Sequence, residues 1–317
     1  MRRASAALGF LFLSACGGGG GGSPTSPAVV PPAATPRPSG WPAGTTIQLV
    51  DGDTGRPVAG TFVVAGATVQ AGAPLGAAVA EGATVDITIP GFLARQTLVR
   101  TGETQLLLWP DSSAMPADYT RALVYTSVRA SPGVLEVLSP MRRLPTRTRT
   151  VAVVPSAAIQ GDPEAMDAHR AAVDALNAAL APLGLSFRLG GTGDLSIPTR
   201  VDPSAGSCVD RSTRAFTSLS LSNAEVVWAE ITYCGTAISS TEGTVAHELG
   251  HAFGLWHSLD PSDMMYPFAR SSRAVGPTAR EALTMSLMRA RRPGTQWPDN
   301  DRQSAAAAAV LVETVVD

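Results

Sequence analysis

Three of the chain's four histidines stand at fixed spacing around one glutamate. The stretch from His247 to His257 reads H-E-x-x-H-x-x-G-x-x-H, and Glu248 follows the first histidine directly. On a helix, His247 and His251 are one turn apart and project from the same face. Two imidazoles in this arrangement can hold one zinc ion, and Glu248 beside them can take a proton from a metal-bound water. The spacing therefore predicts a metal site.

Gly254 and His257 make this prediction more specific. Glycine enters the left-handed conformation without strain, so the helix can end at Gly254 and the chain can bring His257 in from a new direction. Three neutral nitrogens and one open position are typical of a catalytic zinc site. A bare H-E-x-x-H occurs on helices by chance, whereas the longer pattern does not readily do so.

Length and composition place broad limits on the protein. The 317 residues suffice for two domains plus tails, and the hydrophobic content of 44% suits globular domains. The formal net charge is −2, so nothing indicates nucleic-acid binding.

The N-terminal stretch is typical of an export signal. Arg2 and Arg3 precede a short apolar run from Ala6 to Leu13, which is too short to span a membrane. Leu13-Ser14-Ala15-Cys16 follows and resembles the lipobox of bacterial lipoproteins, which implies that residues 1–15 are removed and that Cys16 is lipidated. The alternative is an ordinary secretory signal cut nearby.

The segment after Cys16 reads as a spacer. Residues 16–40 are rich in Gly, Ser and Pro and cannot bury a core, so they predict a flexible tether. We therefore expect an exported protein that is lipid-anchored to a bacterial membrane, on the outer membrane or cell surface, and faces the periplasm or the exterior. In such an oxidising compartment Cys208 and Cys234 are expected to form a disulfide; two buried free thiols are the alternative.

Residues 41–110 predict a small all-β sandwich domain. Four β-rich runs separated by turn signals support it: 47–50, 61–64, 85–89 and 104–108. The stretch 49–58, with Pro90-Gly91-Phe92, resembles carboxypeptidase-regulatory-like modules of exported bacterial proteins. Asp51 and Asp53 could bind calcium, but a solvated hairpin turn is the simpler interpretation.

Residues 111–149 are expected to be a connecting segment with strands at 122–128 and 134–138, which either bridge the two domains or begin the second one. From residue 150 the pattern predicts a strand at 151–154, a helix capped by Asp162 and started by Pro163, and a strand at 186–189. Residues 190–222 read as irregular, and 225–234 as a longer strand. His169, within the helix, is interpreted as a surface or packing residue.

Two capping boxes predict the starts of the remaining helices. Ser239 with Glu242 is expected to cap the helix that carries the zinc motif. Thr278 with Glu281 is expected to cap a second helix that ends at Pro293-Gly294. Residues 293–317 form a tail that either docks as a short helix or frays.

The residues that follow His257 narrow the interpretation to a family. Ser258 comes directly after it, and Asp263-Met264-Met265-Tyr266-Pro267 follows. With these the chain resembles the metzincin zinc endopeptidases, and among them the matrixins. The resemblance implies an α+β catalytic domain over residues 150–292, with a twisted mixed sheet, an active-site helix and a C-terminal helix.

The resemblance also implies roles for the matching residues. His247, His251 and His257 would be the ligands of one catalytic Zn²⁺, and Glu248 the general base and then proton donor. Met265 would form the hydrophobic floor below the metal, the Met-turn, with Tyr266 beside it. If Met264 is the floor residue instead, Tyr266 stands where other metzincins carry a switching tyrosine.

Two features of animal matrixins are missing from the sequence. No propeptide with a metal-binding cysteine is apparent, and His169 is the one histidine outside the motif, so a second, histidine-rich zinc site is not expected. Calcium sites cannot be read from the sequence.

The predicted activity is zinc-dependent hydrolysis of peptide bonds in extracytoplasmic proteins. The resemblance implies that a protein or peptide substrate pairs with an edge strand, which we place at 226–232, and that the Met-turn and the loop 268–275 wall the specificity pocket. That loop contains Arg270 and Arg273, but charged loop residues are usually just solvated. The alternative is a membrane-tethered binding lipoprotein whose zinc domain is inactive. The intact Glu248 favours the enzyme.

Overall fold

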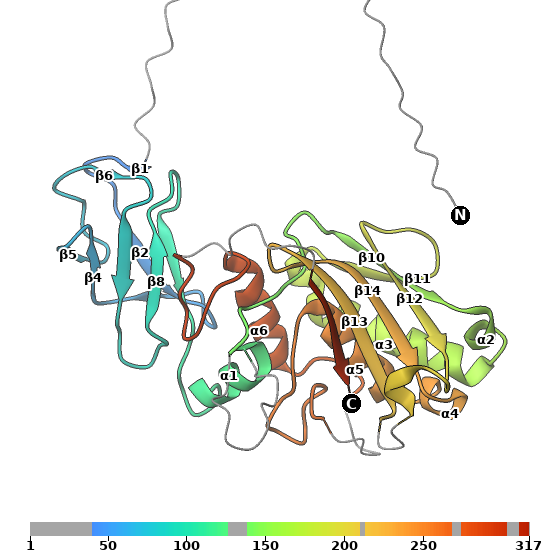
Figure 1. The fold of residues 1–317 in the computed structure, drawn as a ribbon. Helices are drawn as coiled ribbons and strands as arrows, with labels where there is room; N and C mark the ends of the chain where they lie inside the picture. The colour runs from blue at the N-terminus through green and yellow to red at the C-terminus, as the bar shows by residue number, and fades with distance from the viewer. Residues whose placement is uncertain (1–39, 126–137, 210–212, 268–273, 303–310, 317) are drawn as a thin grey trace, which may run out of the picture. The chain divides into compact units, whose positions relative to one another are not determined.

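The computed structural model describes residues 40–125, 138–209, 213–267 and 274–302, and the backbone of 311–316 (Figure 1). The predicted signal peptide, Cys16 and nearly all of the tether lie outside these ranges, as do the predicted strand 134–138 except for its last residue and most of the loop 268–275. Within the described residues, no helix combines the length and apolar character needed to cross a membrane.

Residues 40–108 form a β domain of short strands around their own core. A three-stranded sheet, β3-β2-β9, and a four-stranded sheet, β5-β4-β7-β8, are accompanied by the pair β1-β6. The alternation in β4 shows why it is a strand: Phe62 and Val64 are buried, while Thr61 and Val63 are exposed. The strands are β1 Gly40–Trp41, β2 Gln48–Asp51, β3 Pro57–Val58, β4 Thr61–Val64, β5 Ala67–Gln70, β6 Val79–Ala80, β7 Thr84–Ile87, β8 Arg95–Leu98 and β9 Gln105–Leu108.

The connecting segment contains a helix where a strand was expected. α1 spans Ala117–Tyr125, so the predicted strand at 122–128 is wrong over its described part. Tyr119, Thr120, Leu123 and Val124 are buried, and this spacing is that of one helical face. The Asp111 side chain accepts a hydrogen bond from the Ala117 amide, which satisfies one free N–H at the helix start.

The second domain is built on a six-stranded mixed sheet in the order β11-β10-β12-β14-β13-β15. The strands β10, β11, β12 and β14 pair in parallel, whereas β13 runs antiparallel to β14. Two of these strands occupy the region expected to be irregular, so that prediction is wrong. The bounds are β10 Thr150–Pro155, β11 Ser186–Leu189, β12 Leu195–Val201, β13 Ala215–Ser222 and β14 Glu225–Tyr233.

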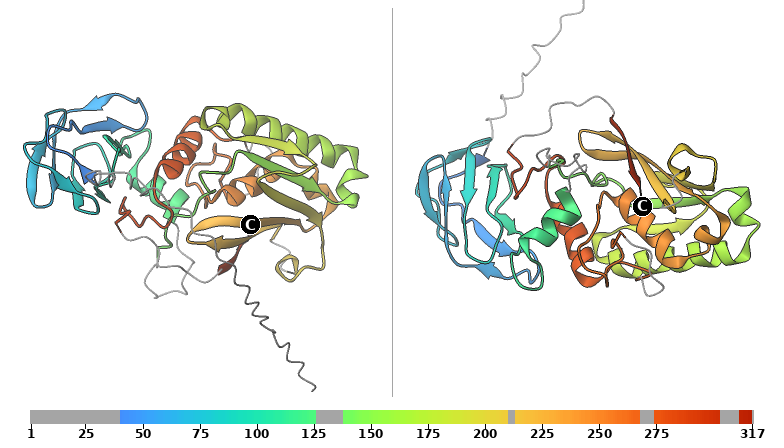
Figure 2. Two further views of the ribbon diagram at one scale, coloured as in Figure 1. Left: turned by 90° about the horizontal axis from the view of Figure 1, so that it is seen from above. Right: turned by 60° about the horizontal axis from the view of Figure 1, so that its bottom comes forward.

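Two helices cover the sheet and pack against each other (Figures 1 and 2). α3, Pro163–Leu180, begins as predicted, because the Asp162 side chain accepts hydrogen bonds from the Glu164 and Ala165 amides. α5, Glu242–Phe253, carries the zinc motif. Its N-cap is Thr241 rather than Ser239, because Ser239 is the last residue of the short helix α4, Thr236–Ser239, and Glu242 is already the first residue of α5. The one-turn helix α2 spans Ala157–Gln160.

The last helix, α6, spans Ala279–Ala290 and begins with the predicted capping box of Thr278 and Glu281. Beyond it, the prediction that the tail forms a short helix or frays is wrong over residues 311–316, while residues 303–310 lie outside the described ranges. Residues Leu311–Val316 form a strand, β15, that pairs antiparallel with β13 and lies beside it as the dark red arrow in Figure 1. The strand β14 is therefore inside the sheet, between β12 and β13, and not at its edge as expected.

The segment after α6 contacts the β domain through buried charges. Arg291 forms a bidentate ion pair with Asp299, with N–O distances of 2.7 and 2.9 Å, and donates to the Leu107 carbonyl oxygen. The backbone of Gln96 in β8 hydrogen-bonds to Asp299 and Asp301. Arg95, which also donates to the Leu107 carbonyl, is buried among these charges; burial and the neighbouring Arg291 lower its pKa to about 10.

Candidate metal centre

The three histidines of the motif converge as the sequence predicted. Potential ligand atoms of His247, His251 and His257 all lie within 4.8 Å of one another, and among the described residues they form the one group of three or more such side chains that could hold a metal ion. His247 and His251 are buried, while His257 is partly exposed. The site thus has one open side.

Hydrogen bonds fix which ring nitrogens face the centre. His247 Nδ1 lies 2.7 Å from the Met264 carbonyl oxygen, and His251 Nδ1 lies 2.9 Å from that of Leu255. A carbonyl can only accept, so each Nδ1 carries the proton and each Nε2 presents a lone pair. These two Nε2 atoms are 3.1 Å apart. Two facing lone pairs at that distance repel each other unless a cation lies between them, so the residues fit a bound zinc.

Both methionines of the predicted Met-turn lie directly below the motif. Gly250, between the two helical histidines, has no side chain, and a Cβ there would come within 2.2 Å of the Met265 sulfur and 2.8 Å of the Met264 methyl carbon. The Met265 carbonyl also accepts a hydrogen bond from the Ser258 amide. Met265 thus packs closest under the helix, while Met264 holds His247 through its backbone.

Gly254 turns the chain toward His257. Its φ of +109° lies in the left-handed region, and a Cβ there would come within 2.5 Å of the Arg142 carbonyl oxygen. Its amide bonds to carbonyls of the last helical turn, which closes α5. The Arg142 guanidinium lies 3.6 Å from the Trp256 ring centre, so the turn rests on the connecting segment.

Sequence reasoning recognised Glu281 as a helix cap but missed a second contact it makes. The buried Glu281 carboxylate accepts hydrogen bonds from the amides of Met264 and Met265, at 3.2 and 2.8 Å, as well as from Thr278. Burial and the nearby Asp263 raise the pKa of Glu281. One carboxylate therefore joins the start of α6 to the backbone of the Met-turn.

Asp263 completes this support and was also missed. It is fully buried, binds the Ser258 hydroxyl, and accepts from Arg280 Nε and Nη2 at 3.0 Å each. Ser258 directly follows His257, so Asp263 links the third histidine's segment to α6. The sequence does contain a hydroxyl donor, Ser258, five residues before a carboxylate acceptor, Asp263, and this spacing could have suggested that the two side chains bond.

Thr217, on β13, is the remaining functional neighbour that sequence reasoning missed. Its hydroxyl lies within hydrogen-bonding distance of Glu248 Oε2 and 3.1 Å from the Glu248 carbonyl oxygen. Both residues are fully buried. The contact fixes the orientation of the Glu248 carboxylate relative to the sheet. Residues 190–222 had been read as irregular, so nothing placed Thr217 on a strand beside α5.

Other candidate residues lie away from the centre. His169 is buried in α3, with Nδ1 2.7 Å from the Ala165 carbonyl oxygen and Nε2 3.2 Å from the Thr199 hydroxyl. Burial lowers its pKa, as suits a neutral packing residue. Asp51 accepts from the Asp53 amide and the Thr54 hydroxyl at 2.9 Å each, which is the arrangement of a self-contained turn.

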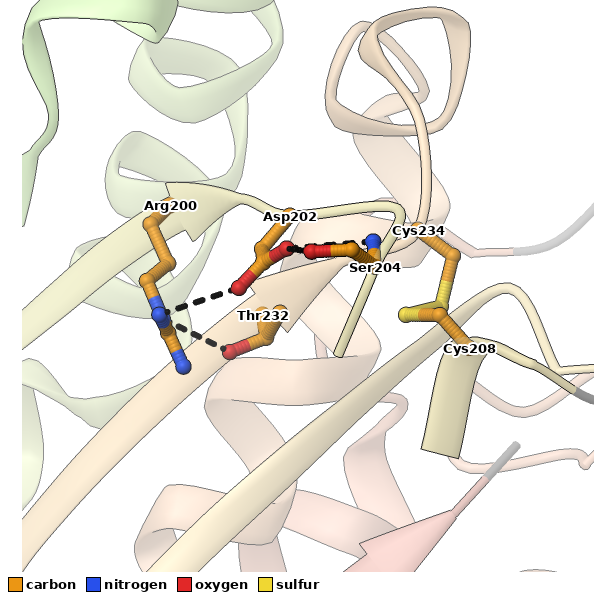
Figure 3. The surroundings of a disulfide bond; sticks show 6 residues. All are labelled: Arg200, Asp202, Ser204, Cys208, Thr232 and Cys234. Carbon is orange, nitrogen blue, oxygen red and sulfur yellow. Dashed lines mark hydrogen bonds and ion pairs between the residues drawn. A yellow bond between two sulfur atoms is a disulfide. The ribbon is translucent and has the colours of Figure 1, made fainter. Parts of the chain in front are cut away.

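Cys208 and Cys234 are joined by a disulfide, with 5.3 Å between their Cα atoms (Figure 3). Cys208 ends the 3₁₀ turn Gly206–Cys208, and Cys234 directly follows β14. Beside the bond, Asp202 accepts from the amide and hydroxyl of Ser204, at 3.1 and 2.7 Å. The disulfide thus ties the segment before β13 to the end of β14.

Comparison with known proteins agrees with the site. The family model Peptidase_M10, Matrixin, matches residues 208–280, which include the disulfide, α5 and the Met-turn. Among solved structures, the chain is similar to metalloproteinase-II from Bacteroides fragilis, at 12% identity, with 76% of this chain and 84% of that chain covered and a TM-score of 0.28. No curated protein matches the chain.

The family match and the histidine geometry together define a metallopeptidase domain. Within this domain, which has an α+β fold, residues 208–280 are similar to the matrixin family. The boundaries predicted for the β domain, the connecting segment and the tail stay predictions, as do the individual roles of the site residues.

Proposed function

We propose that the chain is a zinc-dependent endopeptidase in which His247, His251 and His257 bind the metal and Glu248 is the general base. The observation that carries the proposal is that the Nε2 atoms of His247 and His251 lie 3.1 Å apart, next to a buried Glu248 whose carboxylate contacts the Thr217 hydroxyl. Ligands and base are thus both oriented by the fold, as a catalytic site requires.

Each residue contributes a separate part of the chemistry. A zinc ion bound by the three histidines would bring the pKa of its water near 7 and polarise the scissile carbonyl. Glu248 accepts the proton of the attacking water and later delivers it to the leaving amine. The backbone carbonyls of Met264 and Leu255 keep the two helical imidazoles in the tautomer that presents Nε2.

We further propose that the substrates are proteins or peptides outside the cytoplasm. The Arg2-Arg3 start, the apolar run and the lipobox-like Leu13–Cys16 support export and lipid anchoring at Cys16. The Cys208–Cys234 disulfide supports it independently, because such bonds persist in oxidising compartments. Metabolic labelling with a fatty-acid analogue tests this: label should appear on the wild-type protein and be absent from Cys16→Ser.

The Glu248→Gln variant tests the peptidase. It keeps the side-chain volume and removes the base, so cleavage of labelled casein should fall by about 10²–10⁴-fold while zinc content stays at one ion per chain. Glu242→Gln is the matched control, because Glu242 begins the same helix and is exposed. It should cleave at the wild-type rate.

Two results would contradict the proposal. Wild-type cleavage by Glu248→Gln would exclude Glu248 as the base. A zinc-loaded wild-type protein with no chelator-sensitive cleavage across a peptide library would instead favour the binding lipoprotein with an inactive zinc domain.

A further inference from the structure

The outer edge of β13 is occupied by another segment of the same chain. Six consecutive residues pair in antiparallel register, from Leu221 opposite Leu311 to Phe216 opposite Val316. The sequence of β15, Leu-Val-Glu-Thr-Val-Val, is rich in β-branched residues and suits an extended strand. Without β15, β13 would be the edge of the sheet, since β14 covers its other side.

This edge runs past the proposed catalytic base. Thr217, whose hydroxyl binds Glu248, stands opposite Val315 in the β13–β15 register. The helix α5, which carries Glu248 and two of the histidines, packs against β13. A strand lying along this edge therefore passes Thr217, the position of β13 whose hydroxyl contacts the base.

A peptide that bound this edge would use the same backbone groups that β15 now uses. Extended ligands bind open sheet edges through main-chain hydrogen bonds, and an edge accepts one strand at a time. The resemblance to the metzincins implies that extended substrate pairs with a sheet edge, and the outer edge of β13 is the one that passes Thr217. We propose that residues 311–316 occupy this edge as an internal competitor of extended substrate peptides. This inference rests on the proposed peptidase activity for its substrate.

Proline at two consecutive positions of β15 tests the proposal. Glu313→Pro with Thr314→Pro removes two adjacent backbone N–H groups, so at least one ladder donor is lost whichever alternation holds. In a Glu248→Gln background, the fluorescein-labelled hexapeptide Leu-Val-Glu-Thr-Val-Val should bind the proline variant about tenfold more tightly than the parent. The same peptide with both prolines is the matched control and should bind neither.

Kinetics then connect the edge to substrate. With Glu248 intact, the proline variant should show a KM for labelled casein about tenfold lower than wild type at the same kcat, and the hexapeptide should inhibit it competitively. Deletion of residues 303–317 provides a second variant with the same expectations, and circular dichroism verifies that each variant folds.

The outcomes separate the two proposals. Equal hexapeptide binding by the parent and the proline variant, or binding by neither, would contradict the inference that a free peptide can replace β15 on the edge of β13. Tight binding without inhibition of casein cleavage would show an edge that substrate does not use, which also overturns the inference. Absence of chelator-sensitive cleavage in every variant would instead refute the peptidase, while the binding difference would still decide whether β15 can be displaced.

Discussion

At the scale of single residues, Thr217 is the contact that most directly affects the proposed chemistry. A buried carboxylate that must accept a proton needs a fixed orientation, and the Thr217 hydroxyl supplies a donor from a neighbouring strand. A hydroxyl has one proton, so it can bond either to Oε2 or to the Glu248 carbonyl at any moment. Because the Thr217 hydroxyl keeps its proton, this hydrogen bond orients the Glu248 carboxylate while leaving it negatively charged and able to accept a proton.

Replacing Thr217 by Val should lower kcat by about 10- to 100-fold with little change in KM, because the shape is kept and a hydrogen bond to a charged group, worth about 1.5–3 kcal/mol, is removed. Thr217→Ser, which restores the hydroxyl, should recover most of the rate. Steady-state cleavage of labelled casein measures both. Equal rates for Val and wild type would show that the contact does not orient the base.

The metal ligands could be predicted from the sequence, whereas their supports could not. His247, His251 and His257 are fixed by spacing along one helix and one turn, which are local properties of the chain. Glu281 and Thr217 reach the site from α6 and β13, and such contacts depend on how distant elements pack. The capping-box pattern predicts that Glu281 caps α6, but it does not predict that the same carboxylate binds the Met264 and Met265 amides.

At the scale of elements, the disulfide fixes the loop that leads into β13. It closes a loop with a sequence separation of 26 residues, and the loss of chain entropy in the unfolded state predicts a stabilisation of about 3.5 kcal/mol. The double variant Cys208→Ser, Cys234→Ser should lose about that amount of unfolding free energy.

Urea unfolding measures this loss, with both proteins in chelator so that metal binding does not contribute. Wild-type protein kept in reducing agent is the control and should unfold with the double variant. A double variant as stable as the oxidised wild type would contradict the expected contribution of the bond.

The elements that sequence reasoning missed share a physical cause. In β13, Thr217, Leu219 and Leu221 alternate with residues on the opposite face, but its serines resemble a loop composition. In α1, the apolar positions fit a helix only when the pattern is read from Ala117; the window that began at Ala122 looked like a strand. Strand β15 is stabilised by pairing with β13, whose residues lie 90 to 100 positions earlier in the sequence, and no local pattern reveals such a contact.

At the scale of the whole molecule, a buried ion pair joins the segment after α6 to the β domain. Arg291 and Asp299 are fully buried, and Arg291 also donates to Leu107 of β9. A buried pair contributes little net stability against an apolar replacement, but the loss of one partner leaves a buried charge uncompensated. The junction therefore depends on both residues being present.

Asp299→Asn should lower the free energy of unfolding by about 3–5 kcal/mol, because it leaves the Arg291 charge without its carboxylate. The matched control is Glu103→Gln, which breaks the partly exposed Arg100–Glu103 pair, with its 3.6 Å N–O distance, and should cost about 1 kcal/mol or less. Thermal unfolding of both variants gives the comparison. Equal midpoints would indicate that Arg291 finds another partner.

The junction with the β domain also lies only a few residues before β15 in the sequence. Asp299 and Asp301 are held on β8, and eight residues, 303–310, separate Arg302 from Leu311 in β15. Because so few residues connect β15 to the junction, β15 competes for the edge of β13 at an effective concentration on the order of millimolar. On the proposal made above, a free peptide must exceed that threshold or pair with β13 more strongly than Leu-Val-Glu-Thr-Val-Val does. Substrate peptides that are dilute and pair weakly with β13 would then escape cleavage, whereas substrates at high local concentration, or with segments that pair strongly as strands, would be cleaved.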